Sequence, residues 1–176
     1  MPVRMVRYAG DKVLRKKARA VKSVNSKRTR KLIDDMFETM YADGGVGLAA
    51  PQVGESVQVI VIDTREDGQR MALINPRVTM RSKSVVEEKE GCLSIPGVEG
   101  MVCRSEKVIV RGRSPEGKWA EITGEGLLGR ALQHEIDHLN GVLFIDHLSQ
   151  TEKNELAPAL AEIQRLQRKQ RVVAGE

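Results

Sequence analysis

The segment Gln133-His134-Glu135-Ile136-Asp137-His138 decides how this chain of 176 residues is interpreted. It lies within residues 126–139, where apolar side chains on more than one face predict a largely buried helix. Two histidines four positions apart on a helix lie about one turn apart on the same side, so His134 and His138 can hold one metal ion. Glu135 is about 100° round the helix from His134, where it can act on a water at the metal without binding the ion.

A catalytic divalent ion needs a third protein ligand and one open position for water or substrate. Metalloproteases that add a third histidine to this motif would need it where the chain has Phe144. Those that use a downstream glutamate would need it where the chain has Pro158. Glu155 and Glu162 are not excluded as ligands, but neither stands at the expected spacing. The helix and the residues after it therefore do not complete a protease site.

Cys92 is the alternative third ligand, in the segment Glu90-Gly91-Cys92-Leu93-Ser94. The glycines at positions 91 and 97 make this a tight segment that another backbone can approach closely. A thiolate with two imidazoles is a sound ligand set for a borderline divalent metal. Considered alone, Cys92 could equally be a small buried side chain, which is what we expect of Cys103.

Another glycine-containing segment, Gly45-Val46-Gly47-Leu48-Ala49-Ala50-Pro51-Gln52, follows a helix expected at residues 27–41. It lacks the Gly-Lys-Ser/Thr of a phosphate-binding loop and the spacing of a dinucleotide-binding loop. Gln52 is its most informative residue, because its amide could donate a hydrogen bond where glycines permit close approach. Considered alone, Gln52 could be an ordinary loop glutamine.

The rest of the chain alternates short β-branched segments with turns, which predicts strands. They are expected at residues 57–63, 71–75, 84–88, 107–113 and 118–123, the last two as a hairpin. A further helix is expected at residues 151–171, either kinked at Pro158 or beginning there. Without repeats or long linkers, we expect one catalytic domain over residues 1–176. Its class is α+β, with antiparallel β-sheets packed around the central metal-binding helix and helices near both termini.

The formal net charge is +5, with basic residues concentrated at 15–31 and 165–171. Such runs are typical of solvated helix faces and loops, and no interleaved aromatic residues indicate RNA binding. No apolar run approaches the roughly 20 residues that a membrane-spanning helix needs. No secretory signal is recognisable, so we expect a cytoplasmic protein in which Cys92 and Cys103 stay reduced.

Together and in this order, three segments resemble the motifs of peptide deformylases: Gly45 to Gln52, Glu90 to Ser94 and Gln133 to His138. The resemblance covers most of residues 5 to 150, and further matches lie at Ile74-Asn75-Pro76, Glu106-Lys107-Val108, Gly126-Leu127-Leu128 and Gly141-Val142-Leu143-Phe144. It implies a metal-dependent hydrolase. Its reaction would be removal of the N-formyl group from the N-terminal formylmethionine of newly synthesised polypeptides, with release of formate.

The resemblance also implies a role for each matching residue. The metal ligands would be Cys92, His134 and His138. Glu135 would be the general base and then the general acid, and Gln52 and the backbone N–H of Leu93 would stabilise the oxyanion. The nascent peptide would add as a strand. The residues beside it would be Val46, Gly47 and Gly91, and Leu127 would line an apolar pocket for the methionine.

The family implies one divalent ion per chain, natively Fe²⁺, with Zn²⁺, Ni²⁺ or Co²⁺ accepted. The expected partners are N-formylmethionyl nascent peptides and, through the basic C-terminal helix, the ribosome near its exit tunnel. Neither a membrane nor a sequence-specific nucleic acid is expected, and the source would be bacterial or an organelle after import. Two positions depart from the family pattern: several relatives carry arginine where this chain has Glu99, and relatives tend to have an apolar residue where it has Arg130, near the methionine pocket. These two residues leave open which substrate side chains the cleft prefers.

Two other functions stay open on the residues alone. A metalloprotease would share the metal, the water and Glu135, but it lacks a third ligand at the expected spacing. A non-catalytic basic protein that binds the ribosome or RNA around a structural metal would normally need four protein ligands, and the sequence offers three.

Overall fold

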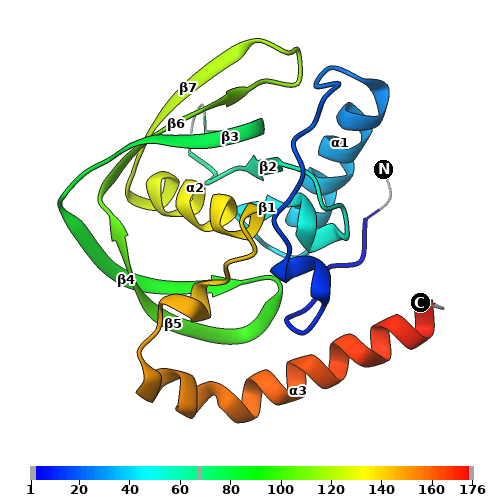
Figure 1. The fold of residues 1–176 in the computed structure, drawn as a ribbon, viewed down its shortest axis with the longest axis vertical. Coiled ribbons are helices and arrows are strands. Elements are labelled where there is room, and N and C mark those ends of the chain that lie inside the picture. Colours follow the sequence, from blue (N-terminus) through cyan, green and yellow to red (C-terminus); the bar gives the residue numbers. More distant parts are fainter. Residues whose placement is uncertain (1–2, 67–68, 175–176) are drawn as a thin grey trace.

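The computed structural model describes residues 3–66 and 69–174. A five-stranded antiparallel sheet, in the order β1-β2-β3-β6-β7, and a two-stranded ribbon, β4–β5, lie on either side of a central helix, α2 (Figure 1). The helices and strands are α1 (Lys27–Ala42), β1 (Gly47–Ala49), β2 (Val59–Ile62), β3 (Met71–Arg81), β4 (Val85–Cys92), β5 (Ile95–Ser105), β6 (Lys107–Arg113), β7 (Trp119–Glu125), α2 (Gly126–Leu139) and α3 (Gln150–Ala174). The expected α+β class is confirmed.

The central helix has the expected bounds, and the helix expected at residues 27–41 is α1. All five expected strands form, as β2, β3, β4, β6 and β7, with β3 and β4 longer than expected. The sequence pattern does not reveal β1 or β5. In β5 the residues Pro96, Gly97 and Gly100 interrupt the alternation that identifies a strand, and β1 is only 3 residues long.

The C-terminal helix α3 begins at Gln150 and continues through Pro158, so the expectation that it begins at this proline is wrong. Pro158 lacks the N–H that would bond to the carbonyl of Asn154, one turn earlier. Both residues are exposed. Water can therefore hydrogen bond to that carbonyl, and the helix tolerates the proline.

Both faces of β2 are covered by helices, with α1 on one side and α2 on the other (Figure 1). Ile60 and Ile62 belong to the cluster that includes Leu132 of α2. Val59 and Val61, which point to the opposite face of the strand, belong to the cluster that includes residues of α1. All four residues of β2 are at most 1% exposed. Burial on both faces explains why the sequence of this strand is a continuous apolar run.

The central helix α2 is largely buried, as its sequence predicts: 11 of its 14 residues are buried. Its apolar residues pack on the five-stranded sheet, where burying one leucine such as Leu132 is worth about 1.5–3 kcal/mol. The same burial takes polar residues into the interior, and each of them needs a partner there. These residues are Arg130, Gln133, His134, Glu135 and His138.

The C-terminal helix α3 lies along β5 and the N-terminal segment (Figure 1). Ile163 of α3 is 4% exposed and belongs to a cluster with Ile95 of β5. Gln167 is 2% exposed. Its Oε1 accepts from the backbone N–H of Tyr8 at 2.6 Å, and its Nε2 donates to Asp11 at 3.1 Å. The inner face of α3 is therefore part of the packed structure. None of the described helices is long and apolar enough to cross a membrane.

Candidate metal centre and cleft

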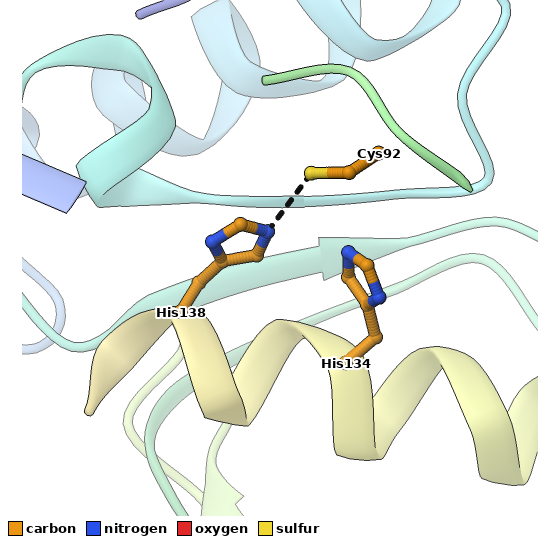
Figure 2. A group of neighbouring side chains, drawn as sticks. All are labelled: Cys92, His134 and His138. Carbon is orange, nitrogen blue, oxygen red and sulfur yellow. Dashed lines mark hydrogen bonds between the residues drawn. The ribbon is translucent and has the colours of Figure 1, made fainter. Parts of the chain in front are cut away.

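The two histidines of the helical motif lie one turn apart on α2, with ring centroids 5.0 Å apart. Cys92, at the end of β4, points at them from the ribbon (Figure 2). Its Sγ is 3.2 Å from Nε2 of His138. One ligand atom from each of Cys92, His134 and His138 lies within 4.8 Å of the other two. The structure thus brings together the three residues that the sequence suggests as metal ligands.

A tight turn brings Cys92 to the helix. The register of β4 and β5 shifts between Gly91 and Cys92, and Cys92 then pairs with Ile95 across a turn of two residues, Leu93 and Ser94. Ser94 and Ile95 are fully buried, and the carbonyl of Ser94 accepts from the backbone N–H of Ala9 at 2.8 Å. The turn is therefore anchored on both sides, and the direction of the thiol is set.

Glu90 determines which nitrogen of His134 faces the cysteine. Nδ1 of His134 donates to Oε2 of Glu90 at 2.9 Å. Arg104 donates to both oxygens of Glu90, at 2.8 and 2.9 Å. Burial opposes ionisation of Glu90, but the hydrogen bonds from Arg104 and His134 outweigh it and hold the pKa of the carboxyl well below its usual range. Because Nδ1 is committed to a carboxylate, Nε2 of His134 is the atom left for a metal.

The donor set fits a divalent metal ion. Burial and the neighbouring His134 hold the pKa of His138 well below its usual range, so this imidazole is neutral, which is the form that binds metals. For His134, burial alone would lower the pKa, but hydrogen bonds with Cys92 and Glu90 raise it well above the usual value. The ionised Glu90 favours a cation at this imidazole, and a metal ion at Nε2 can replace the proton there.

Glu135 lies beside these residues but turns its carboxyl toward β1. It is 5% exposed, and its Oε2 has no hydrogen-bond partner among the described residues. Burial, the largest cause, raises the pKa of Glu135 to about 7. A carboxyl that titrates near neutrality can both accept and return a proton, which is what a general base that later acts as an acid requires.

Gln52 is held in one orientation. Its Oε1 accepts from the backbone N–H of Ala49 at 2.8 Å. Its Nε2 is thereby turned toward the ribbon, where it lies 3.2 Å from Oγ of Ser94 and 3.5 Å from Sγ of Cys92. The side chain is 1% exposed. Its N–H donors therefore point at the place where the three candidate ligands meet.

These groups border one cleft of about 840 Å³. Of the ten site residues expected from the sequence, nine line it, and His138 lies buried behind the others. The nine are Val46, Gly47, Gln52, Gly91, Cys92, Leu93, Leu127, His134 and Glu135. Glu99 and Arg130 line it too. Glu99 is an exposed rim residue 3.7 Å from Lys89, whereas the guanidinium of Arg130 is buried and turned to Glu90 at 2.8 Å.

Comparison with known proteins adds an independent finding. The model of the polypeptide deformylase family matches residues 3–154. A peptide deformylase of Halothermothrix orenii is 54% identical over 147 residues, which are 83% of this chain and 94% of the relative. The chain belongs to the peptide deformylase family. The family expected from the sequence is thus confirmed.

Solved structures of deformylases have the same fold. The crystal structure of a peptide deformylase from Legionella pneumophila superposes with a TM-score of 0.87 at 44% identity, and covers 94% of this chain and 98% of that one. A deformylase from Thermus thermophilus also gives a TM-score of 0.87, at 37% identity, over 94% of this chain and 99% of that one.

The sequence pattern alone does not assign a role to three residues around the candidate site: Glu90, Arg104 and Arg130. Glu90 stands in a quoted motif, but nothing in its spacing says that it faces His134. Arg104 and Arg130 are 14 and 40 positions from it. In the register of β4 with β5, Arg104 lies opposite Val86 and Glu90 lies opposite Gly100, so strand pairing alone does not predict the contact between Arg104 and Glu90. The contact with Arg130 depends on how the ribbon lies on α2.

Gly47 provides a test of the Glu135 geometry. A Cβ at this position would lie 2.5 Å from Oε1 of Glu135. Gly47→Ala should therefore displace the carboxyl and lower turnover about 100-fold, the scale of a misplacement of about 1 Å, while the metal content stays unchanged. Gly91→Ala adds the same methyl group elsewhere in the cleft, where the nearest heavy atom is 3.7 Å away. Formate release and metal content are measured for both variants. Wild-type turnover by Gly47→Ala would contradict the contact assigned between Gly47 and Glu135.

Proposed function

We propose that the chain removes the N-formyl group from the formylmethionine at the start of newly made polypeptides, by hydrolysis to formate and a free amine. The observation that carries this proposal is the convergence, at one cleft, of three candidate metal ligands, the carboxyl of Glu135, whose Oε2 has no hydrogen-bond partner among the described residues, and the amide of Gln52. Membership in the deformylase family supports the same reaction.

Cys92, His134 and His138 would hold one divalent ion, and we propose Fe²⁺ as the native one, with Zn²⁺, Ni²⁺ or Co²⁺ as alternatives. A divalent ion held by three protein ligands lowers the pKa of a water at its open position and polarises a carbonyl oxygen. Glu90 would keep His134 oriented for this task. A ligand set of one sulfur and two nitrogens can bind each of these metals.

Glu135 would transfer the protons. With its pKa raised to about 7 by burial, it is partly ionised at neutral pH and can take a proton from the attacking water. The same carboxyl would then return the proton to the nitrogen that leaves as the C–N bond of the formyl group breaks. Gly47 supports this role, because the lack of a side chain there leaves room for the carboxyl.

Gln52 and Leu93 would stabilise the charge that develops on the formyl oxygen. Nε2 of Gln52 points at the ligand cluster, and its orientation is set by the hydrogen bond that Oε1 accepts from Ala49. The backbone N–H of Leu93 belongs to the turn that carries Cys92. Loss of one such donor typically raises the barrier by about 2.7–4 kcal/mol.

The substrate would bind as an extended strand between the two walls of the cleft. Val46 and Gly47, at the start of β1, line one wall, and Gly91 lines the other on the ribbon. Such pairing uses main-chain hydrogen bonds, so it suits an enzyme that must accept many sequences. Leu127, which is 46% exposed beside the cleft, is available to contact the methionine side chain.

The two rival functions fit the arrangement less well. For a metalloprotease, Glu155 lies in a separate groove with Met101, and Glu162 is paired with Arg165 at 2.9 Å. Neither belongs to the group of potential ligands found among the described residues, where Cys92 takes the third place. A structural metal would need a fourth ligand, and that group holds only three residues.

Glu135→Gln tests the proton-transfer role and the reaction together. The amide cannot accept a proton, so formate release from a formyl-Met peptide should fall by about 10²–10⁴, while metal content, measured on protein purified without oxygen, should stay at the wild-type level. Turnover close to wild type in the metal-loaded variant would reject the role of Glu135. Wild-type protein that releases no formate, yet cleaves an unformylated peptide, would favour the protease.

Cys92→Ser tests the third ligand, and Cys103→Ser is its matched control. A serine hydroxyl is a poor replacement for a thiolate, so the first change should lower metal affinity sharply and reduce formate release in proportion. The expectation that Cys103 is buried is wrong: it is exposed on β5, with its sulfur 3.7 Å from Glu87. Its replacement should change neither quantity. Titration of both apo-proteins with Zn²⁺ against a chelator measures the difference. Equal affinities would remove Cys92 from the ligand set.

We propose, as a second element of function, that the outer face of α3 meets the ribosome in the cytoplasm of a bacterium. Its exposed basic residues include Arg168, Lys169 and Arg171, and the opposite face is packed through Ile163 and Gln167. Truncation of α3 would thus expose part of the core, so a change of charge alone is the sharper test.

Replacement of Arg168, Lys169 and Arg171 by glutamine should leave peptide turnover unchanged and weaken co-sedimentation with ribosomes at low salt, because phosphate contacts are electrostatic. The control is a triple glutamine variant at the exposed residues Lys16, Lys17 and Lys22, which removes the same charge elsewhere. Equal sedimentation of both variants would reject a docking role for α3.

A further inference from the structure

Arg130 lines the cleft, and neither the proposed reaction nor the expected methionine pocket gives it a role. It lies on α2, one turn before His134, and its side chain is 9% exposed. We propose, on the basis of the function proposed above, that Arg130 is a positioning residue for the metal centre. It fixes Glu90, and with it the ring of His134, and it holds the ribbon that carries Cys92 against α2.

The contacts of Arg130 span both strands of the ribbon. Its Nη1 donates to Oε1 of Glu90 at 2.8 Å and to the carbonyl of Val102 at 2.9 Å. Its Nη2 donates to the carbonyl of Val86 at 2.9 Å, and its Nε donates to Glu88 at 3.0 Å. One planar guanidinium thus joins α2 to β4 at three points and to β5 at one. A rigid fork of this kind restrains direction as well as distance.

These polar contacts matter because β4 has little apolar packing of its own. Glu90 is the only buried side chain of the strand. A ribbon of two strands is at best marginally stable alone, so its position relative to α2 must come from contacts with other elements. The candidate ligands come from both sides of this junction, with Cys92 on the ribbon and His134 and His138 on the helix.

Arg104 acts on the same carboxylate in a different way. It lies on β5 and donates to Glu90 from within the ribbon, and it also donates to Asp137 of α2 at 2.5 Å. Loss of Arg130 would leave Glu90 paired with Arg104, so the carboxylate would not become an unpaired buried charge. We therefore expect Arg130 variants to fold, with a ribbon that is less firmly placed on the helix.

The test compares Arg130→Met, Arg130→Lys and Arg81→Met with the wild-type protein. Arg81 is the matched control, because it also joins a strand to α2, with Nη1 donating to Gln133 at 2.8 Å. Among the described residues, the ion-pair partners of Glu90 are Arg104, Arg130 and His134, and Arg81 is not one of them. Three quantities are measured for each protein: the Zn²⁺ dissociation constant against a chelator, the visible spectrum of the Co²⁺-loaded form and the melting temperature of the apo-protein. The spectrum reports the ligand geometry of the ion directly.

Arg130→Met should weaken Zn²⁺ binding by about 10–100-fold, the effect typical of lost partners of metal ligands, and should change the Co²⁺ spectrum. Arg130→Lys, which keeps a charge near Glu90 but loses the fork, should recover part of the affinity. Arg81→Met should keep the wild-type affinity and spectrum. If Arg130→Met does not fold, the proposal is tested by comparing the Co²⁺ spectrum of Arg130→Lys with that of Arg81→Met.

Wild-type affinity and spectrum in the Arg130 variants, with only a lower apo melting temperature, would show that Arg130 supports the fold alone and would overturn the proposal. The same loss of affinity in Arg81→Met would overturn it too, because any link between a strand and α2 would then have the effect. These readings do not depend on formate release. If the wild-type protein binds metal but releases no formate, the proposed reaction fails and the role of Arg130 is still tested.

Discussion

The hydrogen bond from Nδ1 of His134 to Glu90 is the contact on which the rest of the site depends. It joins α2 to the one buried side chain of β4. It commits Nδ1, so that Nε2 faces Cys92, two residues further along the same strand. The orientation of one candidate ligand and the position of another therefore follow from a single buried carboxylate.

That carboxylate is stable in the interior only because it has several partners. A buried charge without partners would cost several kcal/mol, and here Arg104, Arg130 and His134 surround Glu90. Apolar residues of similar volume could fill the space, but they would not set the direction of an imidazole ring. The ion pairs are thus better explained by the geometry they impose on the candidate ligands than by a gain in stability.

The cleft combines firmly held polar side chains with stretches of wall where glycines leave the backbone exposed. Gly45, Gly47 and Gly91 line it, and the lack of a Cβ at Gly47 is what leaves room for Glu135. Exposed backbone can pair with another backbone irrespective of sequence, which suits a proposed substrate as varied as nascent chains. The specific side chains are those of the candidate metal ligands and of Gln52; Gln52, His134 and His138 are buried and Cys92 is half-buried.

Local sequence patterns were enough to predict the features that depend on short-range geometry. The bounds of α2, the common face of His134 and His138 and the place of Glu135 between them follow from the helical period, and the order of three motifs identified the family. The meeting of Cys92 with the histidines, and the direction of Gln52 toward Cys92, become visible only in the folded protein. The tertiary structure also shows that Glu90 lies between two arginines that are distant along the chain. These contacts depend on the register of β4 with β5 and on how the ribbon lies on α2. A carboxylate can pair with any arginine that the fold brings near, so its own neighbours in the sequence do not reveal which one it is.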